Sequence, residues 1–271
     1  NGISGEKPTT YAFTNATLVT NEKTTLTVAT LLVKDGKILA AGTRVSIPKD
    51  AMVVDCKGKY IYPSFIDAYS DYGMPNIERQ ARPFNYSAPA QLISNQKGAY
   101  GWNQAIHSEV SAAALFVADE VKAKQLRDIG FGIVLTHQKD GIARGTGALV
   151  TLANTKENKS ILRERATAHY SFSKGSSTQS YPGSLMGSIA LLRQTYLDAK
   201  WYTTNSGKEG LNLSLKAWNE NLNLPQVFEA NDKWNDLRAD KIGDEFGVQY
   251  IIKAGGNEYQ RMDDMIASKA S

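Results

Sequence analysis

Residues 53–71 read VVDCKGKYIYPSFIDAYSD, and this stretch separates two kinds of pattern in the chain. Before it, from about residue 11, short apolar and β-branched runs alternate with turn residues. The run LLVKDGKILAAGT (31–43) places Asp35-Gly36 between two strand-like segments, a pair that favours a two-residue type I′ hairpin. Gly58 marks a further turn. We therefore predict short strands joined by turns over 11–62, after a flexible leader over 1–10.

After Pro63 the chain changes to short apolar runs that alternate with helical periodicity. The apolar runs predict strands at 65–68, 132–136, 148–152, 226–229 and 248–252. Apolar residues at helical spacing predict helices at 109–129, 184–201, 211–223, 232–246 and 258–267. Alternating strands and helices of this kind predict a parallel sheet, either doubly wound or closed into a (β/α)₈ barrel.

The length of the chain argues against a complete barrel. An eight-fold barrel typically needs about 250 residues, and the 271-residue chain has fewer than that after residue 62. We therefore expect an incomplete barrel, and a chain that is a fragment of a longer polypeptide. Residues 73–107 and 154–182 are expected to be long connections, the first of them a lid or a functional loop.

Composition excludes several classes of protein. Hydrophobic residues make up 42% and charged residues 21% of the chain, as in ordinary globular proteins. The net charge of +4 is spread without a basic run, so we expect no nucleic-acid partner. The single cysteine, Cys56, excludes an internal disulfide and a multi-cysteine zinc site. No apolar run is long enough to span a membrane. The sequence does not begin with Met, which favours an exported protein if a signal peptide was removed and otherwise leaves the compartment open.

The motifs around residue 60 resemble the start of the amidohydrolase superfamily, in particular imidazolonepropionase and dihydroorotase. That family has a DGKI-like hairpin followed by a GK-x-hydrophobic-x-PG-hydrophobic-IDxHxH stretch. This sequence matches it at 35–38 (DGKI), 58–59 (GK), Pro63 and 66–67 (ID). The segments 127–152 and 224–259 also resemble the second, fifth and sixth barrel segments of the family. The resemblance implies a β-sandwich segment (11–62), a (β/α)₈-type barrel (63–271 here, incomplete) and metal-assisted hydrolysis of C–N bonds other than peptide bonds.

The sequence departs from the family where the family keeps its metal ligands. Tyr69 and Asp71 stand at the two histidine positions of HxH, which in a strand point to the same face. Glu229 stands where the fifth strand of the family ends in histidine, and Lys253 lies on the sixth, which has no histidine either. Zinc or Mg²⁺/Mn²⁺ is the default cofactor of the family, but we expect none in this chain.

Several residues remain candidates for a site. Asp71 and Glu229 are the candidates for a carboxylate site that would bind a hard cation. His137 and Asp71 are the catalytic candidates, because His137 follows a strand at the end where barrels keep their active sites. Tyr69, Glu229 and Trp102 are candidates for ligand contact. Each has a plain alternative as a packed or solvated residue.

The remaining histidines and glycines carry weaker signals. His107 is interpreted as a packing or capping residue in the long loop, and His169 as part of the polar connection. The glycine-rich run GIARGTGALV (141–150) lacks the G-K-[ST] ending of a phosphate-binding loop, so tight turns explain its glycines better.

Two functional hypotheses follow. In the first, this copy is a structural or ligand-binding part of a longer hydrolase, without the usual dimetal site. In the alternative, it is an active metal-dependent cyclic amidohydrolase with a carboxylate-based site. The expected partner is the remainder of a longer parent chain, and a homo-oligomer is a further option.

Overall fold

The computed structural model describes residues 10–78, 94 and 96–268. Contacts divide the chain into two compact units, Asn1–Phe65 and Ile66–Ser271. Most of the predicted leader and residues 79–93 of the predicted lid lie outside the described residues. Within the described part of the chain, no helix is long and apolar enough to cross a membrane.

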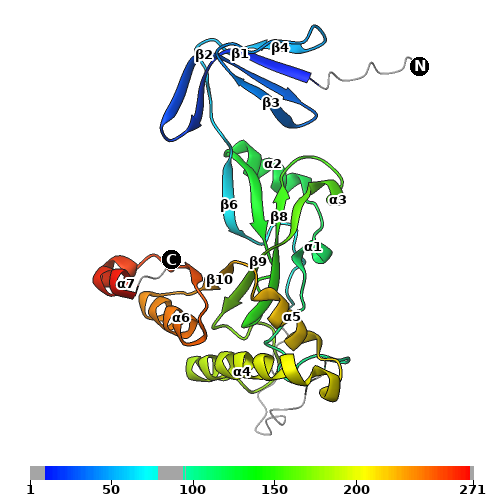
Figure 1. The fold of residues 1–271 in the computed structure, drawn as a ribbon, viewed down its shortest axis with the longest axis vertical. Helices are drawn as coiled ribbons and strands as arrows, with labels where there is room; N and C mark the ends of the chain where they lie inside the picture. The colour runs from blue at the N-terminus through cyan, green and yellow to red at the C-terminus, as the bar shows by residue number, and fades with distance from the viewer. Residues whose placement is uncertain (1–9, 79–93, 95, 269–271) are drawn as a thin grey trace, which may run out of the picture. The chain divides into compact units, whose positions relative to one another are not determined.

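The first unit is a five-stranded sheet in the order β3-β2-β1-β4, with β5 also paired to β1 (Figure 1). Its strands are β1 (Thr10–Asn21), β2 (Thr24–Lys34), β3 (Lys37–Gly42), β4 (Met52–Asp55) and β5 (Tyr60–Ile61). The hairpin between β2 and β3 is confirmed, since Asp35 and Gly36 have φ of 50° and 74°, both positive as a type I′ turn requires.

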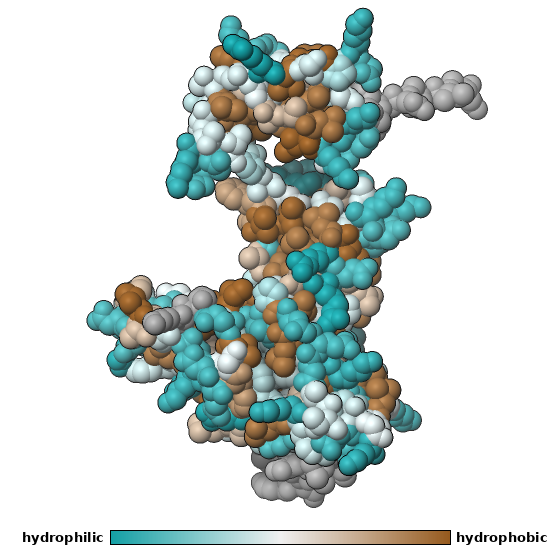
Figure 2. All heavy atoms as spheres, viewed as in Figure 1, coloured by the Kyte–Doolittle hydropathy of each residue, from teal (hydrophilic) through white to brown (hydrophobic). Residues whose placement is uncertain are grey.

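This sheet has a small core and much exposed apolar surface. Ala16, Leu18, Ala29 and Cys56 form its buried cluster. Figure 2 shows hydrophobic residues gathered on the visible face of the unit. The exposed large side chains include Val28, Ile38, Leu39, Met52, Val53, Tyr60 and Tyr62.

The second unit is a six-stranded sheet in the order β11-β10-β9-β8-β7-β6, accompanied by helices (Figure 1). Its strands are β6 (Phe65–Ser70), β7 (Phe131–Thr136), β8 (Ala143–Thr151), β9 (Ile161–Ser171), β10 (Gln226–Glu229) and β11 (Tyr250–Lys253). Its helices are α1 (Ala112–Leu115), α2 (Glu120–Asp128), α3 (Glu157–Ser160), α4 (Leu185–Glu209), α5 (Leu213–Asn221), α6 (Lys233–Phe246), the 3₁₀ helix η1 (Glu258–Arg261) and α7 (Met262–Ser268). The fold class is therefore mixed α/β, with two sheets.

The sheet is not parallel throughout, and that expectation was wrong for its middle. β9, β10 and β11 run parallel, whereas β8 is antiparallel to both β7 and β9. The connections 137–142 and 152–160 are shorter than the dozen or so residues that a parallel crossover needs. Neighbouring strands that are joined by such short connections run antiparallel to each other.

The helix predicted over 109–129 is also wrong in part, since it is two helices separated by extended backbone. The ring of Phe116 packs against that of Tyr72 at 5.7 Å between centroids. The Val117 N–H donates to the Gly73 carbonyl at 2.9 Å. A side chain at Gly73 would collide with Phe116, because an added Cβ would lie 2.5 Å from that ring. Asp119 then caps α2 by accepting from the Lys122 N–H.

β9 lies in the middle of the sheet, although the sequence predicted a polar connection over 154–182. Its carboxyl half is buried, with alternate residues facing opposite sides. Ala168 and Tyr170 join the main hydrophobic cluster. Thr167, His169 and Ser171 are polar residues buried on the other face. The strand was missed because a polar inner face removes the apolar run by which a buried strand is usually identified.

Candidate active site

Six neighbouring strands each bring one polar side chain to the same region. The side chains are Tyr69 (β6), His137 (directly after β7), Arg144 (β8), His169 (β9), Glu229 (β10) and Lys253 (β11). Lys253 Nζ lies 5.7 Å from the centroid of the Tyr69 ring, although β6 and β11 are the two edges of the sheet. The sheet is therefore strongly curved, so that residues of its two edge strands approach each other.

The Arg144 guanidinium lies at the centre of these six side chains, which are called the Arg144 cluster below. Its side chain is 4% exposed, and Nη2 lies 2.7 Å from Oε2 of Glu229. Nη1 donates to the Tyr69 hydroxyl at 2.7 Å, and Nε donates to the Gly141 carbonyl at 3.2 Å. Arg144, on β8, is thus linked to β6 by a hydrogen bond and to β10 by an ion pair, and all three of its nitrogen atoms have a partner. A charge-assisted contact of this kind is stronger than a neutral hydrogen bond.

Beside Arg144, the rings of His137 and His169 are stacked. Their centroids are 3.6 Å apart and their planes differ by 6°. Both residues are fully or almost fully buried. His169 Nε2 lies 2.7 Å from the Thr167 hydroxyl. Among the described residues, no hydrogen-bond partner is found for His169 Nδ1 or for either ring nitrogen of His137.

The surroundings keep both imidazoles neutral. Burial, followed by the charges of Arg144 and Lys139, lowers the pKa of His169 to about 3. Burial, the neighbouring His169 and the same two cations depress the pKa of His137 far below its usual range. The two rings can therefore stack without mutual repulsion at neutral pH.

Tyr69 lies between the histidines and three cations. Its ring is 4.7 Å from that of His137, centroid to centroid, and Lys139 Nζ lies 4.9 Å from the ring centroid. Burial raises the pKa of the Tyr69 phenol well above its usual value; the nearby Arg144 opposes this shift and Glu229 adds to it. Tyr69 is a neutral phenol that accepts a hydrogen bond from Arg144.

The two carboxylates proposed from sequence face different cations. Asp71, with a side chain 68% exposed, lies 3.7 Å from Lys139 Nζ. Glu229 is held by Arg144. Within the described ranges, no group of three or more His, Cys, Asp or Glu side chains has the geometry of a metal site. The residues present therefore do not fit the dimetal centre that the family resemblance implies, since a guanidinium already holds Glu229 and the two imidazoles are stacked face to face.

Trp102 lies in a different part of the unit. It stacks on Tyr181 at 6.1 Å between centroids and packs against the main hydrophobic cluster. Its carbonyl accepts a hydrogen bond from Gln179. The structure therefore places Trp102 as a packed aromatic residue and does not bring it to the Arg144 cluster.

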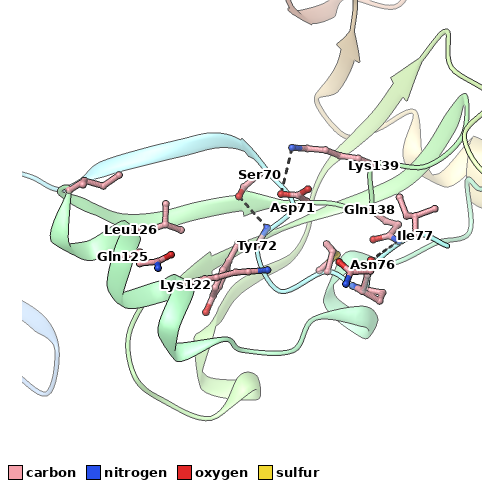
Figure 3. A pocket seen from close by; sticks show the side chains of 13 residues that line it. Ser70, Asp71, Tyr72, Asn76, Ile77, Lys122, Gln125, Leu126, Gln138 and Lys139 are labelled. Atoms are coloured by element: carbon pink, nitrogen blue, oxygen red, sulfur yellow. Dashed lines mark hydrogen bonds and ion pairs between the residues drawn. The ribbon is translucent and has the colours of Figure 1, made fainter. Parts of the chain in front are cut away.

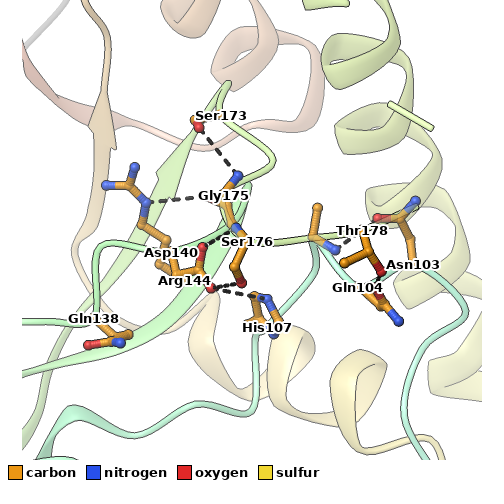
Figure 4. Close-up of polar contacts among 12 residues, drawn as sticks. Asn103, Gln104, His107, Gln138, Asp140, Arg144, Ser173, Gly175, Ser176 and Thr178 are labelled. Atoms are coloured by element: carbon orange, nitrogen blue, oxygen red, sulfur yellow. Dashed lines mark hydrogen bonds and ion pairs between the residues drawn. The ribbon is translucent and has the colours of Figure 1, made fainter. Parts of the chain in front are cut away.

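His107 belongs to a polar network with Asp140 and Ser176, which Figure 4 draws together with Arg144. Its Nε2 lies 3.9 Å from Oδ2 of Asp140. The Ser176 hydroxyl donates to the same carboxylate at 2.5 Å, and the Ser176 N–H donates to its other oxygen at 2.6 Å. Because Ser176 donates to a carboxylate rather than to an imidazole, this trio does not have the arrangement of a serine nucleophile with its base.

The glycine-rich run after residue 141 forms part of β8 and makes room for the histidine pair. A Cβ added at Gly147 would lie 2.6 Å from His169 Nε2. At Gly145, where φ is 76°, an added Cβ would lie 2.0 Å from the Val110 carbonyl. These glycines allow close packing of β8 against its neighbours.

A cavity of about 560 Å³ borders the cluster and is shown in Figure 3. It lies between α2 and the carboxyl ends of β6 and β7, which are joined by the His137 N–H donating to the Ser70 carbonyl. Lys122, Asp71 and Lys139 are its charged lining residues. Lys139 thus faces both the cavity and Tyr69.

Sequence reasoning identified Tyr69, His137 and Glu229 but missed Arg144 as the residue that joins Tyr69 to Glu229. No local signal marks Arg144, because its partners lie 75 and 85 positions away in the chain. His169 was considered only as part of a connection. In 166–171 (ATAHYS), alanine or tyrosine alternates with a polar residue at a period of two, and this is the signal that could have placed His169 on a strand.

Comparison with known proteins bears on the fold. No protein-family model matches the sequence, and no curated protein matches it. The crystal structure of an amidohydrolase from Thermotoga maritima MSB8 aligns with a TM-score of 0.72 at 21% identity, covering 96% of this chain and 68% of that one. A second amidohydrolase structure aligns with a TM-score of 0.41 at 14% identity, over 97% of this chain and 65% of that one, which is too distant to support an argument. Over nearly its whole length, the chain has the fold of the solved Thermotoga maritima amidohydrolase.

Proposed function

We propose that this chain is an amidohydrolase-superfamily domain in which a protein-borne cation network replaces the dimetal centre, and that it serves as a ligand-binding or structural part of a longer hydrolase of C–N bonds. The shared fold and the order of the motifs at 35–38, 58–59 and 63–67 support the superfamily. In this proposal the segment 11–62 is the β-sandwich part, and 63–271 is an incomplete (β/α)₈-type barrel.

The observation that carries the proposal is the position of Arg144. Tyr69 and Glu229, which stand where the family keeps metal-binding histidines, are both bound to this one guanidinium at 2.7 Å. Arginine keeps its charge at all relevant pH values. Arg144 lies at the amino end of β8, beside the carboxyl ends of the antiparallel neighbours β7 and β9, and its fixed positive charge there supports a site that has no need of a metal ion.

The charges around Tyr69 favour an anionic ligand. Arg144, Lys139 and Lys253 approach this residue, and of these Arg144 is paired with Glu229 and Lys139 with Asp71. The histidines add no charge, because their pKa values are lowered. Among the described residues no ion pair is found for Lys253. Its ammonium and that of Lys139 lie 5.7 and 4.9 Å from the centroid of the Tyr69 ring, and two cations this close to one residue favour a carboxylate or phosphate ligand.

Metal analysis tests this proposal directly. The purified chain is exposed to Zn²⁺, Mn²⁺ and Mg²⁺, dialysed, and its metal content measured by mass spectrometry. We expect no stoichiometric metal. One equivalent that is lost in both Asp71→Ala and Glu229→Gln would overturn the proposal in favour of a carboxylate-based metal hydrolase.

Ligand binding is tested by calorimetry with glutarate and inorganic phosphate as probes. We expect Lys253→Ala and Lys139→Ala each to weaken binding about tenfold, while Lys200→Ala, a matched exposed lysine on α4, leaves it unchanged. Equal affinity in all four proteins would remove the anionic ligand from the proposal.

A further inference from the structure

Asp236 is a buried carboxyl group that lies outside the Arg144 cluster. It is part of α6, and it is 1% exposed. Among the described residues, no hydrogen-bond donor is found for either of its two carboxyl oxygens. An ionised carboxylate that is buried without a donor is destabilising, so the state of this group calls for an explanation.

The carboxyl group of Glu258 lies beside Asp236 and has donors of its own. Glu258 is the first residue of η1, and its Oε1 accepts hydrogen bonds from the N–H groups of Gly255 at 2.7 Å and Gly256 at 2.9 Å. Burial alone would raise the pKa of Glu258, but the backbone N–H groups and Asp236 outweigh burial and hold this pKa below its usual value. Glu258 therefore carries the negative charge of the pair.

The surroundings of Asp236 favour its neutral form. Burial, then the contact with Glu258, then the charge of Asp232 at the start of the same helix raise the pKa of Asp236 to about 7. Lys253 on β11 is the cation that faces Asp236, and it opposes the shift. α7 also packs on α6, where its last residue faces Asp240. Two ionised carboxylates are both acceptors, so Asp236 can form a hydrogen bond with Glu258 only while one of them is protonated.

This carboxyl pair lies where the loop after β11 meets the start of α6. The backbone of Gly255 is so close to this start that an added Cβ would lie 2.3 Å from the Asn231 carbonyl oxygen. The Lys233 N–H donates to the Asn257 side chain at 2.9 Å. Residues 254–261 are therefore held on α6 by contacts that surround the carboxyl pair.

We propose that Asp236 and Glu258 share one proton, and that their carboxyl–carboxylate hydrogen bond is a pH-sensitive clasp that holds residues 254–261 on α6. Below neutral pH, the Asp236 hydroxyl donates to Glu258 and the segment is closed. When Asp236 releases its proton to water, two like charges replace the hydrogen bond and the segment opens more often. Lys253 directly precedes this segment and connects it to the Arg144 cluster. The inference goes beyond the proposed function, because the clasp needs no bound ligand.

The test is hydrogen exchange between pH 5 and 9, measured by mass spectrometry on a peptide that covers residues 254–261. The closed segment holds the Asp236 proton with a pKa of about 7, whereas an open segment has the ordinary value near 4. The protection factor, corrected for the intrinsic pH dependence of exchange, should therefore fall by up to tenfold per pH unit between about pH 5 and 7 and then level off. Glu258, with its lowered pKa, stays ionised over this range.

Two variants separate the shared proton from ordinary packing. Asp236→Asn keeps the shape of the protonated side chain, and its amide can donate to Glu258, so protection should stay at the native pH 5 level up to pH 9. Asp263→Asn changes an exposed aspartate of α7 and is the matched control, which should follow the native curve.

The inference is overturned if the native profile is flat between pH 5 and 9, or if Asp236→Asn falls as the native chain does. Circular dichroism at each pH shows whether the chains are folded. If Asp236→Asn does not fold, Glu258→Gln takes its place, since its amide can donate to an ionised Asp236 and should likewise flatten the profile. These outcomes are independent of metal content and anion binding, so the clasp and the proposed function can fail separately.

Discussion

One face of the central strands is apolar and the other is polar, although the same short stretches of chain supply both faces. In β9, Ala168 and Tyr170 enter the hydrophobic cluster, while His169 between them enters the polar site. In β10, Phe228 is buried in the cluster and Glu229 binds Arg144. Because side chains alternate along a strand, one short segment supplies both the core and the site. A substitution on the apolar face should therefore change stability through packing, and one on the polar face through charge.

The largest effect is expected at the packed face. Trp218 is 0% exposed, and its ring meets those of Tyr170 and Tyr196 at 5.4 and 4.8 Å between centroids. Trp218→Ala should lower the free energy of unfolding by about 3–5 kcal/mol, because it leaves a large cavity. Urea unfolding measures this change. A loss below about 1 kcal/mol would show that the apolar face is less tightly packed than the contacts indicate.

The next effect is expected at the charged face. Arg144→Ala should cost about 3 kcal/mol of unfolding free energy, since Glu229 is left as a largely buried charge without a partner. The double variant Arg144→Met/Glu229→Leu should recover most of this loss, because removing both partners removes the unpaired charge. Chemical denaturation of the native, single and double variants gives the comparison. A double variant no more stable than Arg144→Ala would contradict a charge-based effect.

Burial of the histidine pair predicts that the folded chain loses stability at acidic pH. The pKa of His169 is about 3 in the folded chain, below the ordinary value near 6.5 that it regains on unfolding. The unfolded state therefore binds more protons below about pH 6.5, so stability falls as pH falls from there towards about 3. Each imidazole should contribute about 2 kcal/mol of this loss between about pH 6.5 and 5.

The measurement is thermal or urea unfolding of His169→Phe and of the native chain across this range. The variant should lose less stability on acidification, whatever its stability at pH 7. Parallel curves for the two proteins would mean that His169 is not held neutral by burial. His107, which is partly exposed beside Asp140, provides His107→Phe as a control on a histidine outside the stack.

The smallest effect is expected for the exposed pair of Asp71 and Lys139. The Asp71 side chain is 68% exposed and the two charged groups are 3.7 Å apart. Asp71→Asn should change the unfolding free energy by less than about 1 kcal/mol, because water screens an exposed ion pair. Differential scanning calorimetry at low and high salt checks this. A larger loss would place Asp71 in the same cooperative network as Arg144.

Parts of the fold that depend on near neighbours were predictable. The Asp35-Gly36 hairpin, the strand at 226–229 and the helix that begins after Asp232 follow from two or three adjacent residues each. Turn conformation, strand propensity and helix capping act over one or two turns of chain, so sequence alone fixes them. The fold of an amidohydrolase was likewise indicated by motifs of this local kind.

Individual residues of the site could be predicted from the sequence, but the contacts between them could not. Tyr69, His137 and Glu229 could be singled out, but not their joint contact with a guanidinium from β8. Nor did the sequence reveal the antiparallel direction of β8 or the place of β9 in the middle of the sheet. In the sequence, the polar residues of β9 resemble those of a loop. Only the neighbouring strands of the folded chain bury them.

Sequence patterns alone predicted most of the strands and helices, although not β9, and the change of pattern near residue 63; they also place Tyr69 and Asp71 where the family that the sequence resembles has histidines. The contacts of Tyr69 and Glu229 depend on the tertiary structure. The curvature of the sheet brings Tyr69, Arg144 and Glu229 within hydrogen-bond distance across 160 residues of chain. An unpaired buried charge is strongly destabilising, so Arg144 needs an acidic partner nearby. Strand order and register decide which residue that partner is, and residues adjacent in the sequence do not.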